Sequence, residues 1–143
     1  MKKSFVNLCL FAAAACAAAV PGYAQSSQML MVKVPFDFTV GKVSLPAGSY
    51  SVSWIGSIQT HLQLTNKDGK EGVIERINPV GLNPGQVSEA TKLIFHRYGD
   101  QYFLAQFWNL GSETGYELPR SKAEREIGRH VAQPKTEILP AGQ

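Results

Sequence analysis

Three histidines are the side chains of this chain best suited to metal binding or acid–base chemistry: His61, His96 and His130. No two of them have the His-x-His or i, i+4 spacing that presents two ring nitrogens to one metal ion, so the sequence predicts no metal ligands. The fold could still bring His61 or His96 to a carboxylate, because catalytic groups must be close in space and not in sequence. A hydrolase or metal-dependent enzyme is therefore kept as the second alternative, and it requires such a contact in a cleft.

Other catalytic signatures are missing from the sequence. It has no Gly-x-Ser-x-Gly elbow and no phosphate-binding Gly-x-x-x-x-Gly-Lys loop. Asp37 lies between Phe36 and Phe38, but alternation along a strand points its carboxylate away from both rings, towards solvent. We therefore predict that the protein is not an enzyme, with no catalytic residues and no cofactor.

Six ring-bearing side chains form the candidate binding surface: Trp54, His61, Tyr98, Tyr102, Trp108 and Tyr116. Clustered aromatic rings would suit a sugar, a peptide or an apolar ligand. Core packing is the competing interpretation, because a small domain needs large apolar side chains inside. Loops expected at 78–90 and 110–118 are further candidates for ligand contacts, since loops on a rigid scaffold often carry binding residues.

The N-terminal segment indicates the compartment. Residues 1–24 have two lysines, an apolar run at 5–20 and small residues at Gly22 and Ala24, a pattern typical of a secretory signal peptide. Both cysteines, Cys9 and Cys16, lie in this segment, so the mature chain, 25–143, has no thiol. Lipid attachment at Cys16 is disfavoured, because Ala13 stands where lipoprotein signals usually carry Leu. We predict an exported protein, periplasmic or extracellular, with no membrane span in its mature part.

The charge of the mature chain is nearly balanced. Without Lys2 and Lys3, twelve basic residues face eleven acidic ones, and the two kinds are interspersed. A nucleic-acid partner is not expected, since it would require clustered Lys and Arg to neutralise phosphates. The expected partner is a protein, a glycan or a small ligand, and the oligomeric state is left open.

Several segments alternate between apolar and polar residues, as strands with one wet face do. In residues 30–40 every even position is apolar, but Pro35 cannot donate to a ladder, so this strand is expected at a sheet edge or interrupted there by a bulge. In residues 49–54 serines alternate with Tyr50, Val52 and Trp54, which predicts a solvated serine face.

Two hairpins are predicted further along. Residues 58–65 and 72–77 flank an Asn-Lys-Asp-Gly turn, and residues 78–89, with two prolines, are expected to be a long connection. Gly99-Asp100 separates strands 91–98 and 101–109, and a two-residue turn there pairs Tyr98 with Gln101 and, step by step, Ile94 with Ala105. Both faces of this hairpin carry apolar residues, so it is expected at the centre of a sheet, or with its second face covered by a loop or the C-terminal helix.

A short helix should begin at Ser121, whose spacing to Glu124 fits a capping box, and end near His130. In the capping box the serine hydroxyl and the glutamate each satisfy a free amide at the start of the helix. Residues 132–143 contain two prolines and few apolar residues, which predicts a flexible tail.

Four segments, VPFDFTVG at 34–41, LPAGSY at 45–50, FHRYGDQYFL at 95–104 and LPRSKAERE at 118–126, resemble a family of short uncharacterised secreted bacterial proteins. The resemblance implies export and a shared β-rich fold, and it brings no activity. Separately, residues 43–52 are similar to the Leu-Pro-x-Gly-x-Tyr-x-Val segment of transthyretin-like and carboxypeptidase-regulatory-like β-sandwiches.

These observations predict one mainly β domain over residues 25–131, an antiparallel sandwich or flattened barrel of about six to eight strands with one short C-terminal helix. The function expected by elimination is an exported, non-catalytic binding or cell-envelope interaction module. The first alternative is a carrier of a small apolar ligand, which would need a β-barrel pocket.

Overall fold

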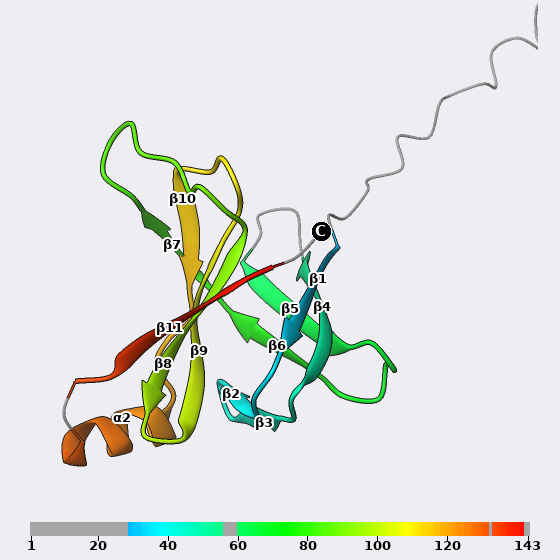
Figure 1. Cartoon of the computed structure of the whole chain (residues 1–143), viewed down its shortest axis with the longest axis vertical. Coiled ribbons are helices and arrows are strands. Elements are labelled where there is room, and N and C mark those ends of the chain that lie inside the picture. The colour runs from blue at the N-terminus through cyan, green and yellow to red at the C-terminus, as the bar shows by residue number, and fades with distance from the viewer. Residues whose placement is uncertain (1–28, 56–59, 132, 142–143) are drawn as a thin grey trace, which may run out of the picture.

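The computed structural model describes residues 29–55, 60–131 and 133–141 of the chain. The predicted signal peptide, with Cys9 and Cys16, lies outside these residues. The described part is mainly β, with 55% of residues in strands and 8% in helix, which confirms the predicted fold class. It has eleven strands, more than the six to eight predicted, because several are short strands of three or four residues. Figure 1 shows two sheets that face each other and one short helix at an end of the larger sheet.

The smaller sheet has four antiparallel strands in the order β1-β4-β5-β6. The strands are β1 (Leu30–Val34), β4 (Gly48–Ile55), β5 (His61–Asn66) and β6 (Gly72–Arg76). Its β5–β6 hairpin is the one that the sequence predicts, and Gly69 takes φ +68° in the turn, a conformation that glycine adopts without strain.

The larger sheet has seven strands, with a main path of β11-β8-β9-β10-β7. They are β7 (Asn78–Gly81), β8 (Lys92–Tyr98), β9 (Gln101–Trp108), β10 (Thr114–Glu117) and β11 (Lys135–Pro140), joined by β2 (Phe38–Val40) and β3 (Val43–Leu45). β2 runs parallel to β9 through a Thr39–Phe103 pair, and β3 pairs with β2. The described strands form no closed barrel, so of the two predicted architectures the open, two-sheet one is correct.

Pro35 marks the place where the chain leaves one sheet for the other. The alternating run that the sequence predicts as one interrupted strand is two strands: β1 at the edge of the smaller sheet and β2 in the larger sheet. Beyond the crossing, Asp37 Oδ1 accepts a hydrogen bond from Ala47 N at 2.8 Å. The Asp37 carboxylate therefore ties together the two ends of the β2–β3 hairpin.

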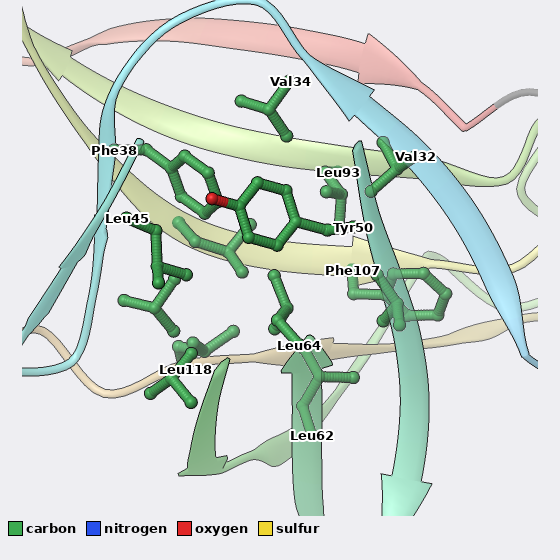
Figure 2. Close-up of a cluster of buried hydrophobic side chains, with 14 of the residues drawn as sticks. Val32, Val34, Phe38, Leu45, Tyr50, Leu62, Leu64, Leu93, Phe107 and Leu118 are labelled. Atoms are coloured by element: carbon green, nitrogen blue, oxygen red, sulfur yellow. The ribbon is translucent and has the colours of Figure 1, made fainter. Parts of the chain in front are cut away.

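The inner faces of the two sheets pack together as the core (Figure 2). Tyr50, Leu62 and Leu64 of the smaller sheet and Leu93 and Phe95 of the larger sheet are completely buried. Side-chain alternation explains which residues of β4 are buried. The serines between them point outward and stay half-exposed, as predicted. Buried Tyr50 donates its hydroxyl to Pro46 O at 2.6 Å, and burial raises the pKa of Tyr50, with a smaller contribution from Glu71.

The β8–β9 hairpin has the predicted register over its first four pairs, from Tyr98–Gln101 to Phe95–Leu104. Beyond them a bulge pairs Ile94 with Gln106 instead of Ala105. The carbonyl of the extra residue, Ala105, accepts a hydrogen bond from Leu118 N. Because of the bulge, Leu104 and Phe107 both face the core although their spacing is odd.

Three short strands lie where the sequence predicts irregular chain. β7 and β10 pair with each other inside the expected loops at 78–90 and 110–118, and β11 lies inside the expected flexible tail, paired with β8 over six residues. Two of these strands, β7 and β11, contain a proline, and for that reason they were not predicted as strands. Both are at sheet edges, where Pro79 and Pro140 need not donate a hydrogen bond to a second neighbour. The predicted tail is therefore wrong for Lys135–Pro140.

Candidate functional site

A pocket of about 280 Å³ opens between the two sheets at the end where β1 begins and β9 ends. Its lining comes from both sheets and from the residues that follow or precede their strands: Met29, Leu30, Val52, Trp54, Thr91, Phe107 and Asn109. We call this the end pocket. It lies where the inner faces of the sheets meet solvent, so it extends the apolar core outward.

The end pocket has a rigid floor and an exposed rim. Val52 and Phe107 are 2% and 1% exposed, whereas Met29 at the mouth is 66% exposed. Trp54 is half-buried, and its ring packs edge-on against Phe107, with centroids 4.7 Å apart and an interplanar angle of 77°. Tyr116 supports the Trp54 ring from a second side at 5.1 Å. The aromatic wall of the pocket is thus held by side chains of the larger sheet.

Two neutral polar residues complete the lining. Thr91 Oγ1 accepts a hydrogen bond from Leu110 N at 3.1 Å, which orients the hydroxyl at the start of β8. Asn109 follows β9, and its side-chain amide makes no hydrogen bond to any other described residue. The part of the lining that the structure describes includes no charged side chain. The end pocket can therefore offer dispersion contacts and a few neutral hydrogen bonds.

The six residues predicted as a binding surface do not share one surface. Trp54 and Tyr116 lie together at the end pocket, but Tyr102 is at the opposite end of the sandwich, stacked on Phe36 with centroids 3.8 Å apart. His61 is exposed on the outer face of the smaller sheet, where its Nδ1 lies 3.0 Å from Thr60 Oγ1. The two remaining residues lie on the outer face of the larger sheet, and both are buried there: Tyr98 and Trp108.

Helix α2 (Lys122–His130) covers part of that outer face through a buried carboxylate. Glu124 is 3% exposed, and its Oε1 lies 2.6 Å from His96 Nδ1 and 3.4 Å from the hydroxyl of Tyr98, which donates to it. Arg120 Nε lies 3.8 Å from the same oxygen. We call His96, Tyr98, Arg120 and Glu124 the helix clasp.

The clasp changes one detail of the predicted capping box. Ser121 Oγ accepts from Glu124 N at 3.1 Å, so the serine caps the helix as predicted. The Glu124 side chain is directed to the sheet instead of back to the Ser121 amide. Burial beside this carboxylate raises the pKa of Tyr98, because desolvation and the negative charge both disfavour a phenolate. The clasp therefore fastens the helix to β8.

The His96–Glu124 contact meets one requirement of the enzyme alternative, since a histidine does reach an acid. Among the described residues, the side-chain hydrogen bonds of this pair are the one between His96 and Glu124 and the one that the buried Tyr98 hydroxyl donates to Glu124. The described residues also contain no group of three or more His, Cys, Asp or Glu that could hold a metal ion. In the structure, the His96–Glu124 pair attaches α2 to β8.

Sequence reasoning missed most of the end pocket. Met29, Leu30, Thr91 and Asn109 lie at the ends of strands that are distant in sequence, and only the packing of the two sheets brings them together. No spacing rule connects such positions. The one available signal was Trp54, an aromatic residue at the end of an alternating strand.

Comparisons with known proteins add no assignment: a scan of protein-family models and searches of curated proteins and of solved structures found no match to the chain. Within the described residues there is also no helix with the length and apolar character needed to span a membrane.

Proposed function

We propose that this chain is an exported, non-catalytic binding domain, and that the end pocket holds a small, mainly apolar ligand. The observation that carries the proposal is the lining of the pocket: five apolar side chains around a concave site, with two neutral polar groups at its edge. Ligand sites commonly combine an apolar wall with a few polar groups that orient the ligand.

The position of the pocket favours binding over chemistry. The floor belongs to the packed core, and the walls belong to β4 and β9, so the shape of the site is set before a ligand arrives. A preformed site avoids the entropy cost of ordering loops on binding. The described residues that line the pocket include none of the acidic, basic or thiol groups that would supply a nucleophile or a general acid.

The carrier predicted as the first alternative required a barrel that encloses its ligand, and the described strands form no closed barrel. The end pocket is smaller and open to solvent, so only part of a larger molecule, or the whole of a small one, fits within its 280 Å³. Binding at the end of an open sandwich thus replaces binding inside a barrel.

Toluene is a suitable first probe, since it is neutral, apolar and smaller than the pocket. Titration monitored by the methyl resonances of Leu30 and Val52 should give saturable shifts confined to the pocket. Trp54→Leu should weaken toluene binding at least about fivefold, because it removes the aromatic wall. The matched control is Ile74→Ala, which alters an exposed apolar residue, 54% accessible, on the other face of the smaller sheet and should leave binding unchanged. Absence of saturable shifts, or equal affinity in the Trp54 variant, would refute the proposal.

A further inference from the structure

We infer that the ligand of the end pocket is a neutral molecule of one or two rings that carries a single hydroxyl or carbonyl group. This inference rests on the function proposed above and specifies the chemical class of the ligand. Three properties of the pocket lead to it: its volume, the lack of charge in its lining, and the placement of Asn109.

The volume limits the size of the ligand. An apolar cavity of about 150 Å³ holds benzene, so roughly twice that volume holds about ten to twelve non-hydrogen atoms. The end pocket, at about 280 Å³, is just below the range usual for drug-sized ligands. A bicyclic molecule fills it, whereas a steroid or a fatty acid would extend far into solvent.

The lining excludes a charged ligand on energetic grounds. Five of its members are apolar, and neither Thr91 nor Asn109 carries a charge that could pair with an ion. A carboxylate or an ammonium group would lose hydration there without an opposite charge in compensation. In the helix clasp, by contrast, the buried charge does have partners, because His96 and Arg120 lie within 4.0 Å of Glu124.

Asn109 selects for one polar group. Its amide offers both a donor and an acceptor, and among the described residues it has no hydrogen-bond partner. Thr91 already accepts a hydrogen bond from Leu110 N, and its hydroxyl keeps its own proton to donate. A hydroxyl or carbonyl on the ligand can bond to Asn109, with Thr91 as a second partner at the same end.

A matched series of bicyclic probes tests this class: indane, 5-indanol, indane-5-carboxamide and indane-5-carboxylate. Binding is measured on the full mature chain by the same methyl resonances. We expect 5-indanol to bind about fivefold more tightly than indane, the effect of one neutral hydrogen bond. The neutral carboxamide should bind at least roughly fiftyfold more tightly than the carboxylate of the same shape, which differs from it mainly in charge.

An Asn109→Leu variant identifies the polar contact. It should abolish the preference for 5-indanol over indane and leave the affinity for indane within about twofold, because only the hydrogen bond is removed. Equal binding of the carboxylate and the carboxamide, or an unchanged preference in the Asn109 variant, would overturn the ligand class while the proposed binding function stands. Failure of every probe, toluene included, would overturn both.

Discussion

The outer faces of the two sheets differ in their exposure to solvent. On the smaller sheet, Ser51, Ser53, Gln63 and Thr65 are half-exposed, and β6 presents Ile74 to solvent. On the larger sheet, Tyr98, Phe103 and Trp108 point away from the core and are nonetheless at least 96% buried. One sheet therefore has a wet face, and the other has a second, smaller apolar layer.

The large side chains on the outer face of the larger sheet are buried by different contacts at its two ends. Helix α2 lies over the end with Tyr98, where Gly128 is close enough that an added Cβ would sit 3.7 Å from the tyrosine hydroxyl. At the other end, part of the segment 82–89 lines a hollow together with Lys92, the cross-strand neighbour of Trp108. The Trp108 ring packs directly on Gly115, where a Cβ would approach it to 2.4 Å. The comparison teaches that an outer face carries large apolar side chains where another segment of the chain, such as α2, packs over it.

The largest expected effect comes from removing a large buried side chain from the outer face of the larger sheet. Trp108→Ala should lower the free energy of unfolding by about 3–5 kcal/mol, since it removes a buried ring and leaves a cavity. Urea unfolding measures the loss. If Ser53→Ala on the outer face of the smaller sheet lowered the free energy of unfolding by as much, the two outer faces would not differ in their contribution to stability.

Gly115 provides a check on the same contact. Gly115→Ala should destabilise the wild-type protein, because its Cβ would collide with the Trp108 ring, and it should cost much less in the Trp108→Ala background. Equal costs in the two backgrounds would show that the ring does not depend on the glycine.

The helix clasp should give the next largest effect. Glu124→Ala should cost about 2–3 kcal/mol, because it leaves the buried Tyr98 hydroxyl without its acceptor and the half-buried His96 ring without its partner. Glu126→Ala on the same helix is the matched control, and it should cost less than about 0.5 kcal/mol, since its ion pairs with Arg129 and His130 are exposed. Similar losses for both variants would assign the effect to helix propensity.

Alkaline pH should lower the stability of the protein through Tyr98, which is buried on the outer face of the larger sheet. The folded state raises the pKa of Tyr98, so its contribution to stability is complete below pH about 10 and is lost as the pH rises through the folded-state pKa. Tyr50 acts in the same direction from the core. We expect the free energy of unfolding to fall as the pH rises above about 10, and to fall less steeply in Tyr98→Phe. Parallel pH profiles would rule out a contribution from Tyr98.

The smallest effect is expected on the wet face. Ser51→Ala and Ile74→Thr should each change the free energy of unfolding by less than about 0.5 kcal/mol, since both side chains are outside the core and the covered face. A loss above about 1 kcal/mol in either variant would mean that another part of the chain covers this face too.

Local patterns predicted the strands that have one wet face and the turns that have a glycine. The serines of β4, the turn at Gly69 and the pairing of Tyr98 with Gln101 all follow from alternation and turn chemistry. The helix start at Ser121 was predicted for the same reason, because a cap involves only neighbours in sequence. The bulge at Ala105 was not, since it satisfies a hydrogen bond from Leu118.

The candidate site was much less accessible to prediction. Trp54 was identified as a binding residue, but Tyr102, Trp108 and His61 were grouped with it only because they are aromatic or ring-bearing, and they lie in three other places. β7 and β11 were assigned to a loop and a tail, because short edge strands with proline have no alternation of their own. Their pairing energy comes from partners far away in the chain.

The amino-acid sequence by itself determined that this chain forms antiparallel strands with one apolar side, because side-chain alternation and turn residues act over a few neighbouring positions. Only the tertiary structure decided which outer face is covered, that Glu124 bonds to His96, and that Trp54 and Asn109 border one pocket. Those outcomes depend on contacts between segments that are distant in sequence, and no local pattern encodes them.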